Sequence, residues 1–576
     1  MIKRLFPILV WLPKYKKKYL AGDLSAGITA GVMLIPQGMA YAMIAGLPPV
    51  YGLYAALMPQ IVYALMGTSA HLAVGPVAMD SLLVAAGLGT LAISGIDHYI
   101  AMAIVLALFM GTIQLVLGLL KMGFLVNFLS KPVISGFTSA AALIIGFSQF
   151  NHLLGIELER TSKFHLTLNT IFNSLSQING YALGIGLLGI LLLVIFKKIN
   201  TRIPSALLVV VLGILAVYYF KLDTYGIQIV GEIPSGLPAF EVPSISLSAL
   251  SELFPIALTL ALIAFMEAVS LAKAIQTKHG YEVNPNQELI ALGVANITGS
   301  FFKSYATTGS FSRTAVVDLS GGKTGLTGLI GAGIVGCTLL FLTPLFYYLP
   351  NAILAAIILV AVVNLVDVRY PKTLFKNTKD EFYLLLITFL LTLFVGIIEG
   401  ILFGTLLALL LLVYRTSKPH MAVLGKIKGT AYFKNITRFE DDIEHEPSVL
   451  VLRFDAQLYF GNKDFFKTEV SRHLTNVNPL PKTIILKAEP INYIDSSALF
   501  MLENVIIDLK KQGITVLFSE VIGPTRDIIK NSKLIEIIGR DNFFVNTIDA
   551  YNFALHKTPK TKLQEKISLQ TKQNET

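Results

Sequence analysis

Three ionisable side chains lie within stretches of sequence that are otherwise apolar. Glu267 falls inside the apolar run 256–272, and Asp80 and Arg313 fall in two further stretches of the same kind. A charged group in such a setting is costly unless it faces a cavity, pairs with an opposite charge or takes up a proton. These residues are therefore the first candidates for a site that binds an ion.

More than one role is open for each of the three. We interpret Glu267 as a group that takes up a proton, with a sodium ion or a structural pair with Arg313 as alternatives. We interpret Arg313 as facing a cavity, and its alternatives are a structural pair or a side chain that extends to the membrane surface. Asp80 adds a second carboxylate, so the number of titrating groups stays open.

Two polar residues precede the charged ones in an expected helix at 22–42. Gln37 and Tyr41 are four residues apart, which places them on one face of that helix. Their amide and phenol could reach the same pocket as the charged groups. The alternative is that they form polar contacts that hold membrane helices together.

The candidate charges must be positioned by two unusually short segments. One is expected at 76–91, after Gly75 and Pro76, and the other at 310–320, after a Thr-Thr-Gly sequence. Short, interrupted segments at matching positions in two halves of a membrane protein predict half-helices that point their N-termini at a midplane site. Helix N-termini favour negative charge, so this geometry suits an anion. Ordinary helices that tolerate Gly and Pro are the alternative.

Six backbone amides at these two helix starts are the expected anion donors. They belong to Val77, Ala78, Met79, Phe311, Ser312 and Arg313. An oxyanion in a low-dielectric place loses hydrogen bonds to water, so fixed donors must replace them. Ser312 would add a hydroxyl donor, unless that hydroxyl bonds its own backbone.

Composition places these segments in a membrane. Of 576 residues, 54% are hydrophobic and 14% charged, against roughly 45–50% and 25% in soluble domains. Residues 1–418 carry 25 Lys and Arg and 17 Asp and Glu, and the much shorter remainder carries 21 and 19. We predict four parts: a cytosolic segment 1–21, a transmembrane domain 22–418, a soluble domain 419–560 and a disordered tail 561–576.

Fourteen apolar segments fit the transmembrane part, and they form two sets of seven at about 22–220 and 253–415. With the N-terminus inside, loops on the inner side carry about 18 Lys and Arg and those on the outer side carry 4, as the positive-inside rule requires. An odd-numbered repeat inverts the second half relative to the first. The predicted fold is an α-helical polytopic membrane protein with a seven-plus-seven inverted repeat and two half-helices.

The soluble part alternates short β-like runs with helical stretches, which predicts a small α/β domain. The runs are 448–454, 483–488 and 514–518. Asp495 and Ser496 precede a helix that ends near Lys511, and either one could cap it. Ser497 would lie at the helix start, where a phosphate is also favoured, so it is a candidate for regulatory phosphorylation.

Three longer motifs resemble the sulfate permease family. They are IPQGMAYAMIAGLPPVYGLY at 35–54, KHGYEVNPNQELIALGVANITGSFF at 278–302 and INYIDSSAL at 491–499. The resemblance covers nearly the whole chain. It implies the seven-plus-seven inverted repeat, a C-terminal cytosolic STAS domain, a homodimer and an anion held between the half-helices.

The resemblance also implies a function. In family members that match around Glu267, an acidic residue accompanies proton or sodium coupling, which favours proton-coupled sulfate symport across the plasma (inner) membrane, with both termini cytoplasmic. Bicarbonate, dicarboxylate or chloride transport or exchange is the alternative, and a membrane sensor or scaffold that signals through the STAS domain, with cytosolic protein partners, is a distant one.

Enzymes and nucleic-acid binders are disfavoured. No ATP-binding motif or nucleophile elbow occurs, so neither primary pumping nor hydrolysis is expected. No metal or other cofactor is expected, because one cysteine, Cys337, excludes a Cys-based cluster and the nine His show no metal-ligand spacing. Basic residues gather beside apolar segments rather than in one patch, so the net charge of +10 indicates orientation in a membrane, not nucleic-acid binding.

Overall fold

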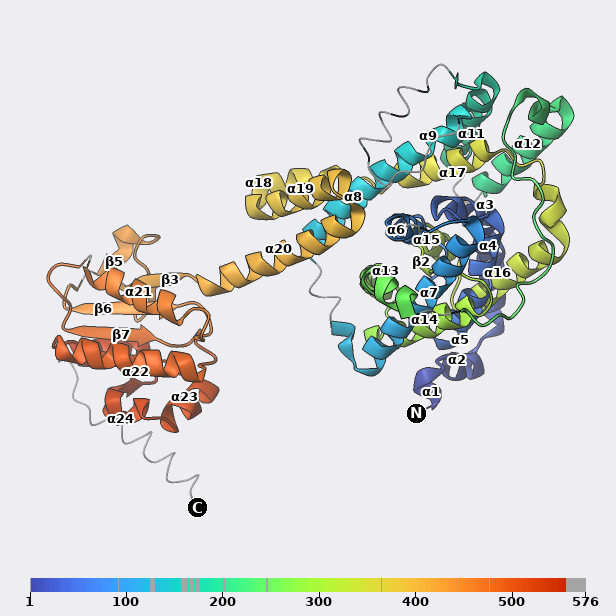
Figure 1. Cartoon of the computed structure of the whole chain (residues 1–576). Coiled ribbons are helices and arrows are strands. Elements are labelled where there is room, and N and C mark those ends of the chain that lie inside the picture. Colours follow the sequence, from blue (N-terminus) through green and yellow to red (C-terminus); the bar gives the residue numbers. More distant parts are fainter. Residues whose placement is uncertain are drawn as a thin grey trace. The chain divides into compact units, whose positions relative to one another are not determined.

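The computed structural model describes most of the chain. It covers residues 2–555 except 92, 125–129, 157–163, 165–169, 171–173, 175–176, 200–203, 245–246, 364, 445 and 476. The predicted disordered tail at 561–576 lies outside the described residues. The chain divides into two compact units, Met1–Ala408 and Leu409–Thr576 (Figure 1).

The first unit is helical. Its helices are α1 (Ile2–Leu5), α2 (Ile8–Trp11), α3 (Leu20–Ile44), α4 (Pro49–Ala55), α5 (Met58–Met66), α6 (Ala78–Gly89), α7 (Ile96–Leu119), α8 (Lys131–Ser148), α9 (Phe150–Leu154), α11 (Gly180–Ile199), α12 (Ser205–Phe220), α13 (Leu247–His279), α14 (Pro285–Ser300), α15 (Phe311–Leu319), α16 (Leu326–Cys337), α17 (Asn351–Val363), α18 (Arg369–Asn377), α19 (Lys379–Phe394) and α20 (Ile397–Ser417). Helix α20 begins in the first unit and extends past Ala408 into the second. The predicted boundary after residue 418 falls one residue beyond the end of α20.

Among the residues that the structure describes, seven helical stretches are long and apolar enough to cross a membrane, and four shorter ones are apolar too. These helices confirm the prediction of a polytopic membrane protein. Several of the predicted segments are divided in the structure; the segment at 132–152, for example, consists of α8 and α9. The segment at 50–67 consists of α4 and α5, with Pro59 in the first turn of α5, and the segment at 325–347 passes from α16 into a π-helical turn at Thr338–Leu342.

Close backbone approach explains part of the first motif. A Cβ atom on Gly52 would lie 1.9 Å from the carbonyl oxygen of Gly38, so α3 and α4 meet where neither has a side chain. Small residues at such contacts let membrane helices pack closely. The packing orients the face of α3 that carries Gln37 and Tyr41, both of which are buried.

The second unit contains a mixed sheet with helices. Its strands are β3 (Met421–Ile427), β4 (Phe433–Asn435), β5 (Ile443–Glu444), β6 (Val449–Phe454), β7 (Thr483–Lys487), β8 (Thr515–Ser519) and β9 (Phe543–Phe544), and its helices are α21 (Lys463–Thr475), α22 (Ser496–Lys511), α23 (Gly523–Lys530), α24 (Leu534–Ile538) and α25 (Thr547–Ala554). The order is β4-β3-β6-β7-β8-β9, with β5 beside β3. Strands β6 to β9 run parallel, and β3 runs antiparallel to β6.

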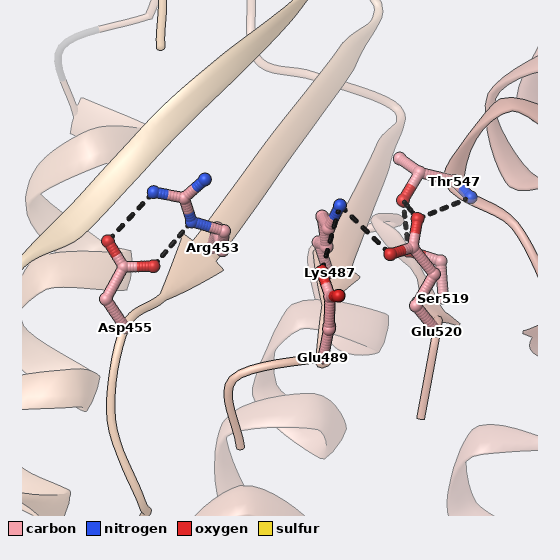
Figure 2. Close-up of polar contacts among 7 residues, drawn as sticks. All are labelled: Arg453, Asp455, Lys487, Glu489, Ser519, Glu520 and Thr547. Carbon is pink, nitrogen blue, oxygen red and sulfur yellow. Dashed lines mark hydrogen bonds and ion pairs between the residues drawn. The ribbon is translucent and has the colours of Figure 1, made fainter. Parts of the chain in front are cut away.

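Charged side chains cross the parallel strands at their carboxyl ends. Arg453 pairs in register with Lys487, and Lys487 with Ser519, so all three occupy one row. Figure 2 shows that Arg453 binds Asp455 and that Lys487 lies between two carboxylates, those of Glu489 and Glu520. This end of the sheet is thus a network of paired charges.

Candidate anion-binding site

Two short helices begin at a small antiparallel ribbon inside the first unit. Strand β1 (Val74–Gly75) pairs with β2 (Thr308–Gly309), with Val74 opposite Gly309. Helix α6 follows β1, and α15 follows β2. With 12 and 9 residues, they are about 18 and 14 Å long and cannot cross a hydrocarbon core of roughly 30 Å. The predicted half-helices are confirmed, and because the strands are antiparallel their starts meet from opposite directions.

Buried side chains hold the ribbon in place. The Asn296 side chain donates to the carbonyl oxygen of Thr307 at 3.0 Å and accepts from the Thr307 amide at 2.8 Å. The Thr308 hydroxyl donates to the carbonyl of Ala264 in α13 at 2.8 Å. The hydroxyl of Thr314 accepts from the amide of Ala73 at 3.0 Å. These contacts tie β2, which leads into α15, to α13 and α14, and they join the segment before β1 to α15.

Arg313 lies at the meeting point of the two half-helices. Its side chain is 1% exposed, and one guanidinium nitrogen donates to the carbonyl of Pro76 at 3.0 Å, just before α6. The Nε and Nη2 atoms have no partner among the described residues. Buried charged donors are normally satisfied, so these atoms are candidates to bind an acceptor from outside the chain.

Two buried carboxylates belong to the same region. Glu267 in α13 and Asp80 in the first turn of α6 interact electrostatically with each other, and Glu267 also does so with Arg313. Both oxygens of Asp80 and one of Glu267 lack a hydrogen-bond partner in the described part of the chain. The sequence placed both in apolar surroundings, and the structure brings Glu267 close to Asp80 and to Arg313.

The predicted residues on α3 reach this region in part. Tyr41 interacts electrostatically with Arg313 and Glu267, which places its phenol near both. Gln37 is buried, and its carbonyl oxygen Oε1 has no partner within the described residues. No direct hydrogen bond from either side chain to Arg313 is present among the described contacts.

The helix starts differ slightly from the prediction. Val77 is the residue before α6, so the first-turn amides of that helix belong to Ala78, Met79 and Asp80. In α15 the hydroxyl of Ser310 caps the helix and accepts from the amide of Arg313 at 3.5 Å. The hydroxyl of Ser310 therefore competes for this amide, and the role of the amide as an anion donor stays a prediction.

Phe311 and Ser312 keep first-turn amides that have no acceptor within the helix. Both residues are exposed, and the Ser312 hydroxyl lies 3.3 Å from that of Ser310. The donors of this half-helix are thus two amides and the Arg313 side chain.

Sequence reasoning missed Tyr305. It is fully buried, its hydroxyl lies 3.0 Å from that of Ser81, and it interacts electrostatically with Arg313 and Asp80. The only sequence signal was its position just before the Thr-Thr-Gly sequence, and a tyrosine there is equally consistent with packing.

Two family models match this chain. The sulfate permease family model covers residues 20–388, and the STAS domain model covers residues 440–550. The chain belongs to the sulfate permease family. The resemblance read from the three motifs is confirmed, and with it an integral membrane transporter that carries a C-terminal STAS domain.

Relatives and solved structures agree with this assignment. Sulfate transporter 4.1, chloroplastic, of Arabidopsis thaliana is 38% identical over 98% of this chain and 84% of its own length. A probable sulfate transporter of Mycobacterium tuberculosis is 33% identical over 94% and 96%. The murine Solute Carrier 26 family member A9 anion transporter in the inward-facing state matches with a TM-score of 0.89, at 27% identity, over 96% and 94% of the two chains.

The STAS domain of this family member contains the third motif. Helix α22 is capped by Asp495, whose side chain accepts from the Ala498 amide at 2.8 Å and from the Phe460 amide at 2.8 Å. Of the two predicted capping residues, Asp495 is the one that caps. Ser497 lies exposed in the first turn, and its phosphorylation stays a prediction.

Proposed function

We propose that this chain is a secondary active transporter of sulfate or a closely related oxyanion, bound between the starts of α6 and α15. The observation that carries the proposal is the buried guanidinium of Arg313, which has two nitrogens without a partner among the described residues. A guanidinium offers planar, paired donors that match an oxyanion. The relatives whose names state sulfate transport favour sulfate as the substrate.

The chemistry at the helix starts supports the same proposal. A dehydrated dianion needs donors that are already oriented, because reorientation in a low-dielectric site is costly. The amides of Ala78 and Met79 would approach from one side, and those of Phe311 and Ser312 from the other. The positive ends of two helix dipoles add to the charge of Arg313.

Proton coupling is proposed for Glu267. An unpartnered carboxylate beside a bound dianion would repel it, whereas a protonated one would not. Protonation of Glu267 would therefore favour anion binding, and the proton would travel with the anion. Asp80, whose two oxygens are also unpartnered, is proposed as a second group that shares this role, and a sodium ion is the alternative coupling ion.

Bicarbonate is the second candidate substrate. The transmembrane domain of the cyanobacterial bicarbonate transporter BicA matches with a TM-score of 0.59, at 25% identity, over 68% of this chain and 98% of that chain. Chloride or dicarboxylate exchange would use the same donors. The presence of Arg313 favours the more highly charged anion.

The membrane setting is also a proposal. We place the transporter in the plasma (inner) membrane as a homodimer, as the resemblance to the family implies. The distribution of Lys and Arg in the loops supports an N-terminus and STAS domain in the cytosol. Cytosolic proteins would bind the STAS domain, and phosphorylation of Ser497 would regulate that binding.

Counterflow in proteoliposomes tests the proposed substrate. Vesicles loaded with unlabelled sulfate should accumulate labelled sulfate at pH 6 and pH 8, and excess sulfate should compete better than bicarbonate, fumarate or chloride. Counterflow of bicarbonate without that of sulfate would favour the second candidate. If the purified, dimeric protein moves none of these anions, the proposal of transport is refuted. A membrane sensor or scaffold that signals through the STAS domain would then be favoured.

A further inference from the structure

Two histidines and an aspartate meet at a place that the anion site does not use. His71 lies in the loop between α5 and β1, His279 is the last residue of α13, and Asp318 lies in α15. One possible ligand atom of each lies within 4.8 Å of the other two. The His71 and His279 rings stack with their centroids 4.3 Å apart.

His71 has the features of a ligand without a metal. It is 3% exposed, and its Nε2 atom is buried without a hydrogen-bond partner among the described residues. Its other nitrogen, Nδ1, lies 3.2 Å from the hydroxyl of Tyr281. In metal sites the non-ligating nitrogen of a histidine is usually held in this way, which fixes the ring and its tautomer.

We propose that His71 Nε2, His279 Nε2 and a carboxylate oxygen of Asp318 form a binding site for a divalent transition metal such as Zn²⁺. Two imidazoles and one carboxylate, with water as a fourth ligand, are a common zinc donor set. Ligand atoms around tetrahedral zinc lie roughly 3.3 Å apart, so metal binding requires the three groups to move closer together and the two stacked rings to turn until their nitrogens converge on one point. The site does not depend on which anion is transported.

The local ion pairs compete with the metal. His279 Nε2 contacts one oxygen of Asp318 at 2.7 Å, and Lys278 Nζ contacts the other at 2.7 Å. The Lys278 side chain is 60% exposed, so this pair contributes little and can dissociate. Lys323 interacts electrostatically with His71 and adds a positive charge that opposes the metal.

The position of the site gives it a structural role. A bound metal would join the loop before β1 to the end of α13 and to α15, three segments separated by up to 247 positions in the chain. Those segments lead into both half-helices and the helix that carries Glu267. The metal would therefore stabilise the elements that hold the anion site, because it binds the folded arrangement only.

The test is zinc binding by the full-length protein, purified in detergent and stripped with a chelator. Zn²⁺ is titrated in competition with a fluorescent chelator, and the unfolding temperature is measured with and without Zn²⁺. We expect binding at micromolar zinc and a higher unfolding temperature. His71→Ala and His279→Ala should each weaken binding by at least about tenfold, and Tyr281→Phe by about tenfold.

Two further variants keep the test decisive. Lys278→Met should tighten zinc binding about three- to tenfold, because it removes the competing cation, so a gain is expected even if the histidine variants fold poorly. His98→Ala, at an exposed histidine, is the matched control and should change nothing. Equal zinc affinity of the parent and His71→Ala, stabilisation by Mg²⁺ as large as by Zn²⁺, or no effect of Lys278→Met would overturn the proposal.

Discussion

The charged network of the STAS sheet and the candidate anion site of the membrane unit differ in whether their charges are paired. In the STAS domain, Arg453 donates two hydrogen bonds to Asp455, and Glu520 accepts from Lys487 and Thr547. In the membrane unit, Arg313 is more deeply buried and yet has two nitrogens without a partner among the described residues. Paired charges stabilise a fold, whereas unpaired buried charges are kept at a cost that a ligand can offset.

Carboxylates show the same contrast. Asp495 and Glu520 in the second unit each accept two or more hydrogen bonds. Asp80 and Glu267 at the candidate site have oxygens without a hydrogen-bond partner among the described residues, whereas buried Asp23 and Glu288 of the same unit each accept three hydrogen bonds. Polar atoms without hydrogen-bond partners thus mark the candidate site more clearly than charge alone. The variants below test this conclusion.

Arg313→Met should have the largest effect. It removes the unpaired donors and keeps the volume, so sulfate counterflow should fall about 100-fold, as for the loss of a principal anion donor. Arg453→Met is the matched control, and counterflow should stay within about twofold of the parent. Equal losses in the two variants would contradict the comparison.

Glu267→Gln should remove the pH dependence of uptake. The parent should take up sulfate several-fold faster at pH 6 than at pH 8, because protonation of Glu267 lowers the repulsion of the bound anion. The variant mimics the protonated form, so the ratio of its uptake rates at pH 6 and pH 8 should approach 1 in the same vesicles. Asp80→Asn tests whether the second carboxylate also takes up a proton. If both variants keep the parent's ratio of uptake at pH 6 to uptake at pH 8, neither residue takes part in proton coupling.

Gly75→Ala should weaken anion binding by about five- to tenfold. A Cβ atom at Gly75 would lie 3.2 Å from Nη2 of Arg313, at a backbone φ of +153°, so it would displace the guanidinium or strain the loop. Competition by unlabelled sulfate in counterflow measures the affinity. Gly89→Ala, where a Cβ would meet nothing within 4 Å, should leave it unchanged.

Glu520→Gln should have the smallest effect. It should change only the stability of the fold and the dependence of that stability on pH. Burial raises the pKa of Glu520, but hydrogen bonds from Thr547 and Lys487 outweigh it and hold the pKa below its usual value. The charged form thus stabilises the fold above the unfolded pKa, and this contribution is lost as pH falls through the folded pKa. The variant should be less stable at pH 7 by about 1 kcal/mol.

That difference between parent and variant should shrink as the pH falls through the lowered pKa of folded Glu520. Hydrogen exchange of β8 and α25 in the full-length protein measures it locally. A constant difference from pH 7 to pH 3 would show that packing, and not the charge of Glu520, is responsible.

Much of the fold was predictable because its signals are local. The Gly-Pro pair at 75–76 and the Thr-Thr-Gly sequence before Ser310 stop one segment and start another, so the half-helix starts were predicted within about two residues. The three predicted β-runs match β6, β7 and β8 to within one residue at each end. Arg313, Glu267 and Asp80 were conspicuous because charge is rare in apolar sequence.

The sequence by itself identified the candidate residues. Only the tertiary structure shows which of their polar atoms lack a hydrogen-bond partner. The cap of Ser310 on the Arg313 amide, the packing of Tyr305 beside Arg313 and the meeting of His71 with Asp318 depend on backbone geometry or on contacts between distant segments. Hydrogen-bond satisfaction is a property of three-dimensional neighbours, so composition and spacing along one chain cannot reveal it.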